Sequence, residues 1–250
     1  MEGIYNIVPT PFDQSGAIDE PSLRRLIDFV IDTGVDGLTI LGFLGEAAKL
    51  SESERAQVID VTLQVNDGRV PVVVGATAQA LDPCLRNARD AADRGADGLL
   101  VAPPRTPRPN EAGVKRHYEA LADAVGISIV VQDFPASSGV FMTPAFIGQL
   151  ASELPQCRYL KLEDDPTAQK VTAILAANPD VLIFGGLGGN FMFEELQRGV
   201  AGMMTGFGFP EILVSIYRDF RSGREEYARD TFYRYLPLIR YENQPGLNLP

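Results

Sequence analysis

The sequence predicts an α/β protein: a (β/α)8 TIM barrel followed by the start of a C-terminal helical extension. From the first residue to about Gly206, short apolar runs alternate with longer amphipathic stretches, the pattern of repeated βα units. Eight such units in about 220 residues fit a closed barrel, and no G-x-G-x-x-G motif follows the first strand. An open, doubly wound sheet is the lesser alternative.

The expected strands are apolar on both faces, as strands covered by helices usually are. They span residues 4–8, 37–41, 70–75, 98–102, 128–132, 158–162, 181–185 and 203–206. In a barrel of this kind function is expected where the strands end.

The expected helices are marked by their ends. The N-cap candidates are Asp19, Ser51, Asp82, Asn110, Thr143 and Asp165, with Pro83, Pro144 and Pro166 at the first helical position. Gly34, Gly68, Gly95, Gly126 and Gly199 lie where helices should stop.

After Gly206 the sequence predicts two more helices, at 210–222 and 225–239. We assign residues 1–222 to the barrel and residues 223–250 to the start of a C-terminal helical region. The chain stops at Asn248-Leu249-Pro250, which resembles a linker, so we expect this region to be truncated.

Composition narrows the range of functions. The 250 residues are 45% hydrophobic, enough for a closed core, and the formal charge of −11 argues against a nucleic-acid partner. No apolar run could span a bilayer and the N-terminus lacks the basic start of a signal peptide, so we expect a cytoplasmic protein without membrane contact. Cys84, Cys157 and the single histidine, His117, are too few for a Cys/His metal cage. No metal is expected.

Lys161 stands out among only four lysines. Alternation along its strand places Tyr159, Lys161 and Glu163 on one face and two leucines on the other, so the lysine should point into the barrel. Burial disfavours an ammonium and makes a neutral amine that can attack a carbonyl more accessible. The alternative is a buried lysine that only pairs with Glu163 or another carboxylate. The other lysines, Lys49, Lys115 and Lys170, are expected on polar loop or helix faces.

Five segments occur in order along essentially the whole chain: Ile7-Val-Pro-Thr-Pro-Phe12, Gly42-Phe-Leu-Gly-Glu46, Ala102-Pro-Pro104, Asp133-Phe-Pro135 with Gly139, and the strand containing Lys161. Together they resemble the dihydrodipicolinate synthase / N-acetylneuraminate lyase family. The resemblance implies a (β/α)8 class I lyase in which Lys161 forms a Schiff base with a 2-keto acid, commonly pyruvate, without a cofactor. It also implies a homotetramer and a chain that continues into a C-terminal helical bundle.

The chain departs from the family's pattern in the loop after the second strand. The family's usual loop is Gly-Thr-Thr-Gly-Glu, whose hydroxyls hold the keto-acid carboxylate and relay protons, but this chain has Phe43 and Leu44 there. Backbone N–H groups of Leu44 and Gly45 are therefore expected to bind the carboxylate.

Further departures affect the fourth and fifth strands. Gln132 replaces the tyrosine that usually shuttles protons, and Ser137 replaces the arginine with which synthases grip an aldehyde co-substrate. Arg105-Thr106 stands where the family has an aromatic pair. These losses argue against dihydrodipicolinate synthase or sialic acid lyase as such.

A smaller branch, the 2-keto-3-deoxy-sugar-acid dehydratases such as the L-2-keto-3-deoxyarabonate enzyme, resembles the chain more closely. The shared segments are Val131-Gln-Asp133, Lys161-Leu-Glu163, Thr205-Gly-Phe-Gly-Phe-Pro210 and Leu236-Pro-Leu-Ile with Glu242-Asn243.

The expected catalytic residues are Lys161, Glu163 and Gln132. Glu163 shares a face with Lys161, about 6.5–7 Å further along the strand, and could act as a base; the alternative is a solvated carboxylate at a strand end. Thr10, Leu44, Gly45, Gly186, Thr205 and Gly206 are expected to bind substrate. The glycines after the last two strands favour close backbone approach to a small substrate, with phosphate binding as the alternative.

The leading hypothesis is a lyase that dehydrates a short 2-keto-3-deoxy acid. Lys161 condenses with the keto group, a base removes a C3 proton, and the C4 hydroxyl leaves as water. A pyruvate-dependent aldolase or a synthase-like condensation would use the same imine, and the loss of the shuttle tyrosine favours dehydration. A phosphosugar aldolase and a catalytically inactive barrel used for binding are the remaining alternatives.

Overall fold

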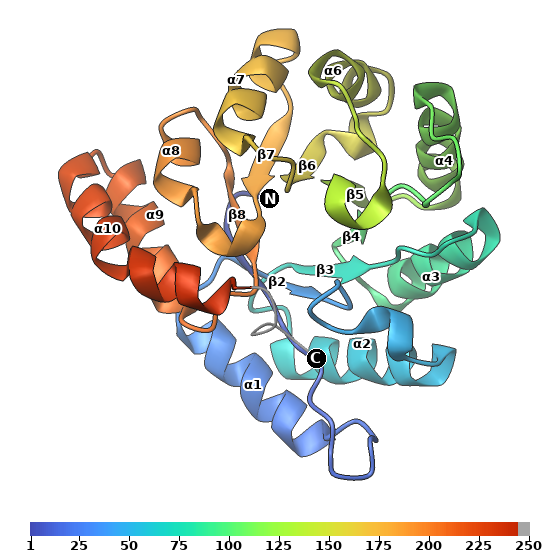
Figure 1. Ribbon diagram of the computed structural model, residues 1–250. Coiled ribbons are helices and arrows are strands. Elements are labelled where there is room, and N and C mark those ends of the chain that lie inside the picture. The colour runs from blue at the N-terminus through green and yellow to red at the C-terminus, as the bar shows by residue number, and fades with distance from the viewer. Residues whose placement is uncertain (245–250) are drawn as a thin grey trace.

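Eight parallel strands close into a barrel in the order of the chain, in a computed structural model that describes residues 1–244 (Figure 1). The strands are β1 (Gly3–Ile7), β2 (Gly37–Ile40), β3 (Val72–Gly75), β4 (Gly98–Val101), β5 (Ser128–Asp133), β6 (Tyr159–Leu162), β7 (Leu182–Gly185) and β8 (Gly202–Thr205). The predicted (β/α)8 barrel is confirmed, and every strand end lies close to its predicted position because the apolar runs are bounded by turn residues.

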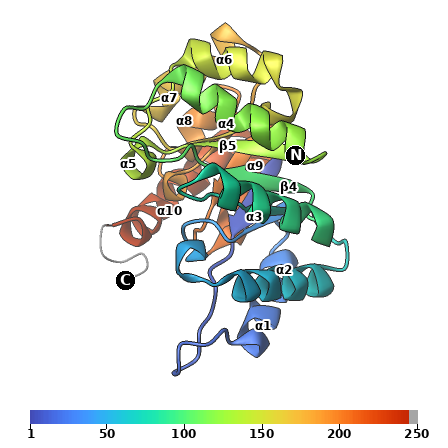
Figure 2. The same ribbon diagram turned by 90° about the vertical axis from the view of Figure 1, so that its right-hand side faces the viewer.

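The helices form an outer layer around the barrel (Figure 2). They are α1 (Glu20–Asp32), α2 (Glu52–Asn66), α3 (Leu81–Arg94), α4 (Glu111–Ala124), α5 (Pro135–Ser138), α6 (Pro144–Glu153), α7 (Thr167–Ala177), α8 (Met192–Leu196), α9 (Pro210–Arg221) and α10 (Glu225–Glu242). Short 3-10 turns η1 (Ala47–Lys49), η2 (Pro155–Cys157) and η3 (Leu187–Gly189) lie in the connections.

Four of the six predicted N-caps are confirmed by a side-chain hydrogen bond to the first turn: Asp19, Ser51, Asn110 and Thr143. The prediction at Asp82 is wrong. The N–H of Cys84 donates to the carbonyl of Ala80 at 3.2 Å, so α3 begins earlier and both Asp82 and Pro83 lie within its first turn.

The N-cap predicted for α7 is wrong too, but in the other direction, because the observed N-cap lies one residue later. Pro166, not Asp165, occupies the N-cap position, because its carbonyl accepts the first helical hydrogen bond, from the N–H of Lys170 at 3.2 Å. The helix itself begins at Thr167.

Large side chains fill the interior of the barrel beneath the site. They come from seven strands and comprise Tyr5, Ile7, Val73, Leu100, Val130, Tyr159, Phe184 and Met204. Tyr5 packs edge-on against Phe184 with ring centroids 5.3 Å apart. Because this layer is closed, a substrate can enter only from the end where the strands finish.

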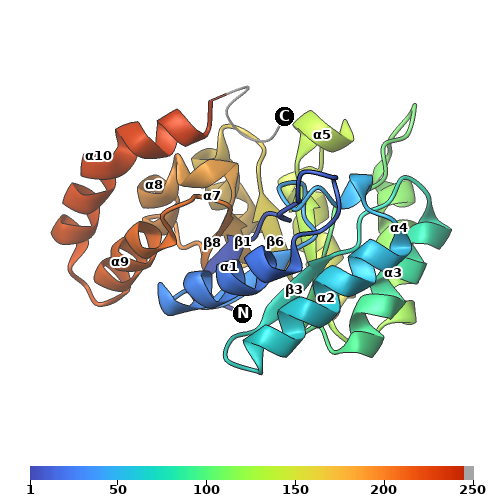
Figure 3. The same ribbon diagram turned by 90° about the horizontal axis from the view of Figure 1, so that it is seen from below.

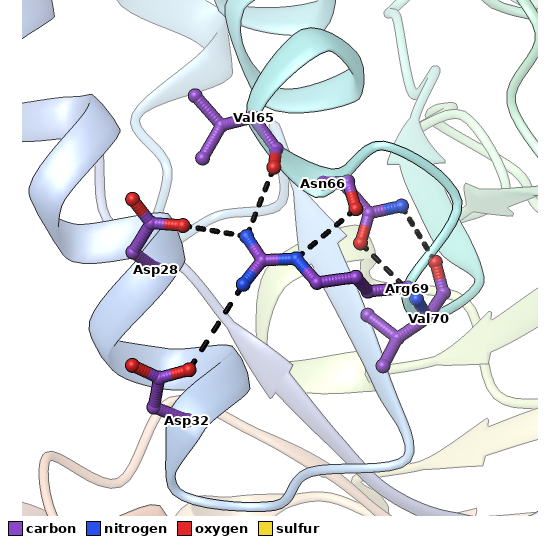
Figure 4. Close-up of polar contacts among 6 residues, drawn as sticks. All are labelled: Asp28, Asp32, Val65, Asn66, Arg69 and Val70. Carbon is purple, nitrogen blue, oxygen red and sulfur yellow. Dashed lines mark hydrogen bonds and ion pairs between the residues drawn. The ribbon is translucent and has the colours of Figure 1, made fainter.

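A polar network joins α1 to the connection between α2 and β3 (Figure 4). The guanidinium of Arg69 contacts Asp28 at 2.5 Å and Asp32 at 3.9 Å, and its Nε donates to the carbonyl of Asn66. The side chain of Asn66 in turn bonds both the N–H and the carbonyl of Val70. This network lies where β3 begins, so it bears on stability and not on catalysis.

The last helix reaches the end of the barrel where the strands finish. α10 packs against α9 and α8, and its C-terminal end lies on the same side of the barrel as α5 (Figure 3). It extends to Glu242, three residues beyond its predicted end. The expected linker at Asn248-Leu249-Pro250 lies outside the described residues, and the domain boundary at residue 222 stays a prediction.

Within residues 1–244, none of the helices combines the length and the apolar character that a membrane crossing requires.

Glu195 on α8 is a buried acid with a consequence for stability. Its side chain lies against Gly185 of β7, where an added Cβ would come within 1.9 Å of Oε2. The pKa of Glu195 is raised from 4.5 to about 7, mainly by burial and to a smaller extent by the nearby carboxylates of Glu194 and Asp165, while Thr167 acts in the opposite direction. The folded protein therefore holds a proton that the unfolded chain has already lost between these pH values.

We expect Glu195→Gln to make the protein more stable than the parent at pH 8. The parent loses free energy of unfolding as pH rises from 4.5 toward 7, because Glu195 ionises more readily in the unfolded chain, and glutamine does not ionise. The gain over the parent is on the order of 3 kcal/mol at pH 8 and small at pH 5. Urea unfolding at both pH values measures it, with the exposed Glu226→Gln as control. A variant with the parent's pH dependence would show that Glu195 is ionised in the fold.

Candidate active site

Lys161 points into the barrel above the layer of large side chains. It lies beside Gln132 of β5 and Phe184 of β7 in the sheet register. Its side chain is only 5% exposed, and its Nζ lies 3.1 Å from Oε2 of Glu163. A lysine amine in its neutral form can attack a carbonyl, and a carboxylate at this distance from Nζ would lie close to the carbon atoms next to the resulting imine.

Glu163 follows β6 directly and is held by main chain and side chain. Its N–H donates to the carbonyl of Asp133 at 2.8 Å, and its Oε2 accepts a hydrogen bond from Nε2 of Gln132 at 2.7 Å. Oε2 therefore receives both the amide of Gln132 and the ammonium of Lys161. The structure brings the three expected catalytic residues into one hydrogen-bonded group.

A cavity of about 140 Å³ adjoins this group. Its polar lining comes from Lys161, Glu163, Thr205, Glu242 and Asn243, and its apolar lining from Ile7, Phe43, Leu44, Phe134, Phe207 and Ile239, with Gly188 and Gly206 between them. Pockets for drug-sized ligands measure about 300–1,000 Å³, so this one suits a short acid. A lysine that only paired with a carboxylate would have no need of such a cavity.

The loop after β2 covers one side of the cavity. Phe43 packs edge-on against Phe134 with ring centroids 5.7 Å apart, while Leu44 lies close to Gly206, where a Cβ would come within 2.0 Å of Leu44 Cδ2. The hydroxyl of Thr10 donates to the carbonyl of Gly45 at 2.7 Å. Neither Thr10 nor Gly45 lines the cavity, so their observed contact holds the loop.

The same loop contains backbone strain. Leu41 has φ 55° and Glu46 has φ 53°, and Leu187 in the loop after β7 has φ 47°. Left-handed conformations are unfavourable for residues with a side chain and concentrate at functional sites. All three lie at the end of the barrel where the cavity opens.

The loops after β7 and β8 complete the wall. Thr205 and Gly206 line the cavity, whereas Gly186 lies behind Glu163, where a Cβ would come within 2.3 Å of Glu163 Cγ. From the buried face of β1, Asn6 donates to the carbonyl of Phe207 at 3.2 Å and holds the second loop.

Two cavity residues at the end of α10, Glu242 in its last turn and Asn243 directly after it, were missed as site residues in the sequence. Oε2 of Glu242 accepts the N–H of Gly208 at 2.9 Å, and Nδ2 of Asn243 donates to the carbonyl of Leu187 at 2.8 Å. Their signal was the Glu242-Asn243 pair in the resemblance to the dehydratases. No local pattern shows that a helix so late in the chain reaches the barrel mouth.

A second cavity, of about 540 Å³, lies between η1, α2 and α3. Gln132 lines this second cavity and not the first, and Phe43 borders both. Gln132 therefore contributes to the site through its bond to Glu163.

Proteins of known family resemble this chain over most of its length. A model of the dihydrodipicolinate synthetase family matches residues 1–247, and the chain belongs to this family of Schiff-base lyases. It is similar to L-2-keto-3-deoxyarabonate dehydratase from Azospirillum brasilense, with 34% identity over 247 residues, 97% of this chain and 80% of that protein. It is also similar to 4-hydroxy-tetrahydrodipicolinate synthase from Persephonella marina, with 33% identity over 92% of this chain and 79% of that protein.

Solved structures show the same architecture. Dihydrodipicolinate synthase from Rhodopseudomonas palustris superposes with a TM-score of 0.92 at 35% identity, over 99% of this chain and 84% of that one. A prophage protein of the dihydrodipicolinic acid synthase family from E. coli K12, in complex with pyruvate, gives a TM-score of 0.90 at 27% identity, over 97% and 83%.

Gly186→Ala tests how closely Glu163 must be placed. The new Cβ would meet Glu163 Cγ at 2.3 Å and displace its carboxylate, so we expect turnover to fall by about 10- to 100-fold, as for a misplacement of about 1 Å. The matched control is Gly126→Ala, where a Cβ meets nothing within 4 Å. Equal activity of both variants, measured as turnover of a 2-keto acid, would contradict this role of Gly186.

Proposed function

We propose that the protein dehydrates a short 2-keto-3-deoxy sugar acid through an imine with Lys161. The observation that carries the proposal is the single carboxylate oxygen of Glu163 that faces both Nζ of Lys161, at 3.1 Å, and the amide of Gln132, at 2.7 Å. A carboxylate oxygen so close to Nζ would lie near C3 of an imine, which supports the proposed role of Glu163 as the base. The similarity to L-2-keto-3-deoxyarabonate dehydratase supports it.

The reaction begins when the amine of Lys161 attacks C2 of the keto acid and water is lost to give the imine. Glu163 then removes a proton from C3, and the electron pair forms an enamine. The enamine expels the C4 hydroxyl, which takes a proton and leaves as water. Hydrolysis of the imine and tautomerisation release a dioxo acid and restore Lys161. The imine serves as the electron sink, so the proposal needs no cofactor.

The substrate lies between charged and apolar surroundings. Its carboxylate is proposed to meet the backbone of Leu44, which lines the cavity. Its distal hydroxyls are proposed to meet Glu242, Asn243 and Thr205, the polar groups of the cavity beyond the lysine. The small cavity favours a five-carbon acid over a longer one.

Gln132 and Ser137 favour dehydration over the alternatives. An amide cannot relay the proton that a retro-aldol cleavage takes from the C4 hydroxyl, and Ser137 on α5 offers no cation for the carboxylate of an aldehyde co-substrate. A pyruvate-dependent aldolase and a synthase-like condensation are the competing proposals because the synthases are similar to this chain as well.

The test is the product formed from a 2-keto-3-deoxypentonate. A dehydratase yields a dioxo acid, which chromatography and mass spectrometry separate from pyruvate and a two-carbon aldehyde. Pyruvate as the dominant product would refute the dehydratase proposal in favour of the aldolase. Turnover of neither kind, without any imine, would favour the inactive barrel.

A further inference from the structure

The sequence predicts Lys170 on a polar loop or helix face, and this prediction is wrong. Its ammonium is buried between two carboxylates, with Nζ 2.6 Å from Oδ2 of Asp133 and 2.7 Å from Oδ2 of Asp164. The side chain of Asp133 is 0% exposed and that of Lys170 is 10% exposed. The three residues come from the end of β5, the loop after β6 and the first turn of α7.

The two carboxylates belong to residues that are adjacent in sequence to Gln132 and Glu163, the two residues that form a hydrogen bond in the site. Asp133 directly follows Gln132, and Asp164 directly follows Glu163. One ammonium on α7 therefore holds the residue after each member of the Gln132–Glu163 pair. The main chain closes the arrangement, because the carbonyl of Asp133 accepts the N–H of Glu163 at 2.8 Å.

The residues of β5 alternate in direction, so the side chain of Asp133 points away from the cavity while Gln132 points toward Glu163. Lys170 does not line the cavity and cannot touch a substrate there. Any effect on the reaction has to pass through the positions of Gln132 and Glu163.

We infer that Lys170 is a positioning residue, which fixes the ends of β5 and β6 relative to each other so that Glu163 stays over Lys161. The inference rests on the proposed function and deepens it. Three features of this contact separate it from an ordinary surface pair: its burial, its two partners, and their sequence adjacency to the functional residues.

The charge on Asp133 explains why a cation is needed here. Burial raises the pKa of Asp133 to about 6, and Lys170 acts in the opposite direction through its hydrogen bond and charge. Without the ammonium, an ionised Asp133 would be buried and unpaired, which is strongly unfavourable. The strand end would then shift or take up a proton, and the carbonyl that holds Glu163 would shift with it.

The test compares Lys170→Met with the matched control Lys115→Met. Lys115 is also a helical lysine with two carboxylate partners, Glu119 and Glu153, but it is partly exposed and far from the site in sequence. Two rates are measured for each folded variant: turnover of the 2-keto-3-deoxy acid, and borohydride trapping of pyruvate at Lys161. Trapping measures imine formation, which does not depend on the exact position of Glu163. Turnover also measures removal of the C3 proton, which does depend on it.

We expect Lys170→Met to lower turnover about 10- to 100-fold while trapping stays within about three-fold of the parent, and Lys115→Met to change neither. Asp164→Ala is the second variant, because Asp164 is partly exposed and its removal leaves no buried charge unpaired. It should lower turnover about three- to ten-fold with unchanged trapping.

Parental turnover in both Lys170→Met and Asp164→Ala would overturn the inference. So would an equal loss of trapping and turnover in folded protein, because Lys170 would then support the whole site. Failure of the proposed function is distinguished by the parent itself, which in that case releases no dioxo acid from the 2-keto-3-deoxy acid.

Discussion

Replacing Lys161 by arginine is expected to abolish turnover and leave the barrel folded. Arginine keeps a positive charge next to Glu163, 3.1 Å away in the parent, so the buried carboxylate retains a partner. Its guanidinium does not lose a proton near pH 7 and cannot become the neutral nucleophile that imine formation requires. The loss is therefore chemical and not structural.

Turnover of the 2-keto acid and thermal unfolding followed by circular dichroism measure the two halves of this expectation. Lys115→Arg, at a lysine on the outer face of α4, is the matched control and should retain full activity. Activity of Lys161→Arg within a few-fold of the parent would refute the Schiff-base mechanism.

Glu163→Gln is expected to slow the release of water by about 10²–10⁴-fold, the usual cost of losing a general base. Glutamine preserves the size of the side chain between Gly186 and Gln132 but cannot accept a proton. Imine formation should survive, because the nucleophile is unchanged. The variant should therefore trap pyruvate with borohydride while it dehydrates slowly.

Glu242→Gln is the variant to compare with Glu163→Gln, because Glu242 is the other carboxylate among residues 1–244 that lines the same cavity. Its Oε2 accepts a backbone N–H from Gly208, so we expect it to affect substrate binding more than the rate of dehydration. A slow Glu242→Gln beside an unaffected Glu163→Gln would move the base to α10. If both variants are unaffected, the base is the substrate's own carboxylate or a water near Gln132.

Local patterns were enough to predict the barrel and the position of its lysine. Buried parallel strands are continuous apolar runs, and a lysine that interrupts one of them with period-2 alternation can only point inward. Glu163 followed from the same alternation. The helix starts at α3 and α7 were misplaced because Asp82 and Asp165 resemble caps, whereas the first helical hydrogen bonds begin at Ala80 and Pro166.

The remaining parts of the site depend on contacts that the sequence does not display. Lys170 appears polar and exposed in its own helix, and only the packing of α7 against the end of β5 brings it to Asp133. Glu242 and Asn243 reach Gly208 and Leu187 from 34 and 56 residues away. Such long-range contacts leave no periodicity in the chain.

The most direct test of the Schiff base at Lys161 is to incubate the protein with pyruvate and borohydride and locate the reduced adduct by peptide mass spectrometry. The structure predicts a single modified site, Lys161, because its amine lies buried beside Glu163 at the wall of the cavity. Labelling of Lys49, Lys115 or Lys170 in its place, or no labelling at all, would contradict the mechanism.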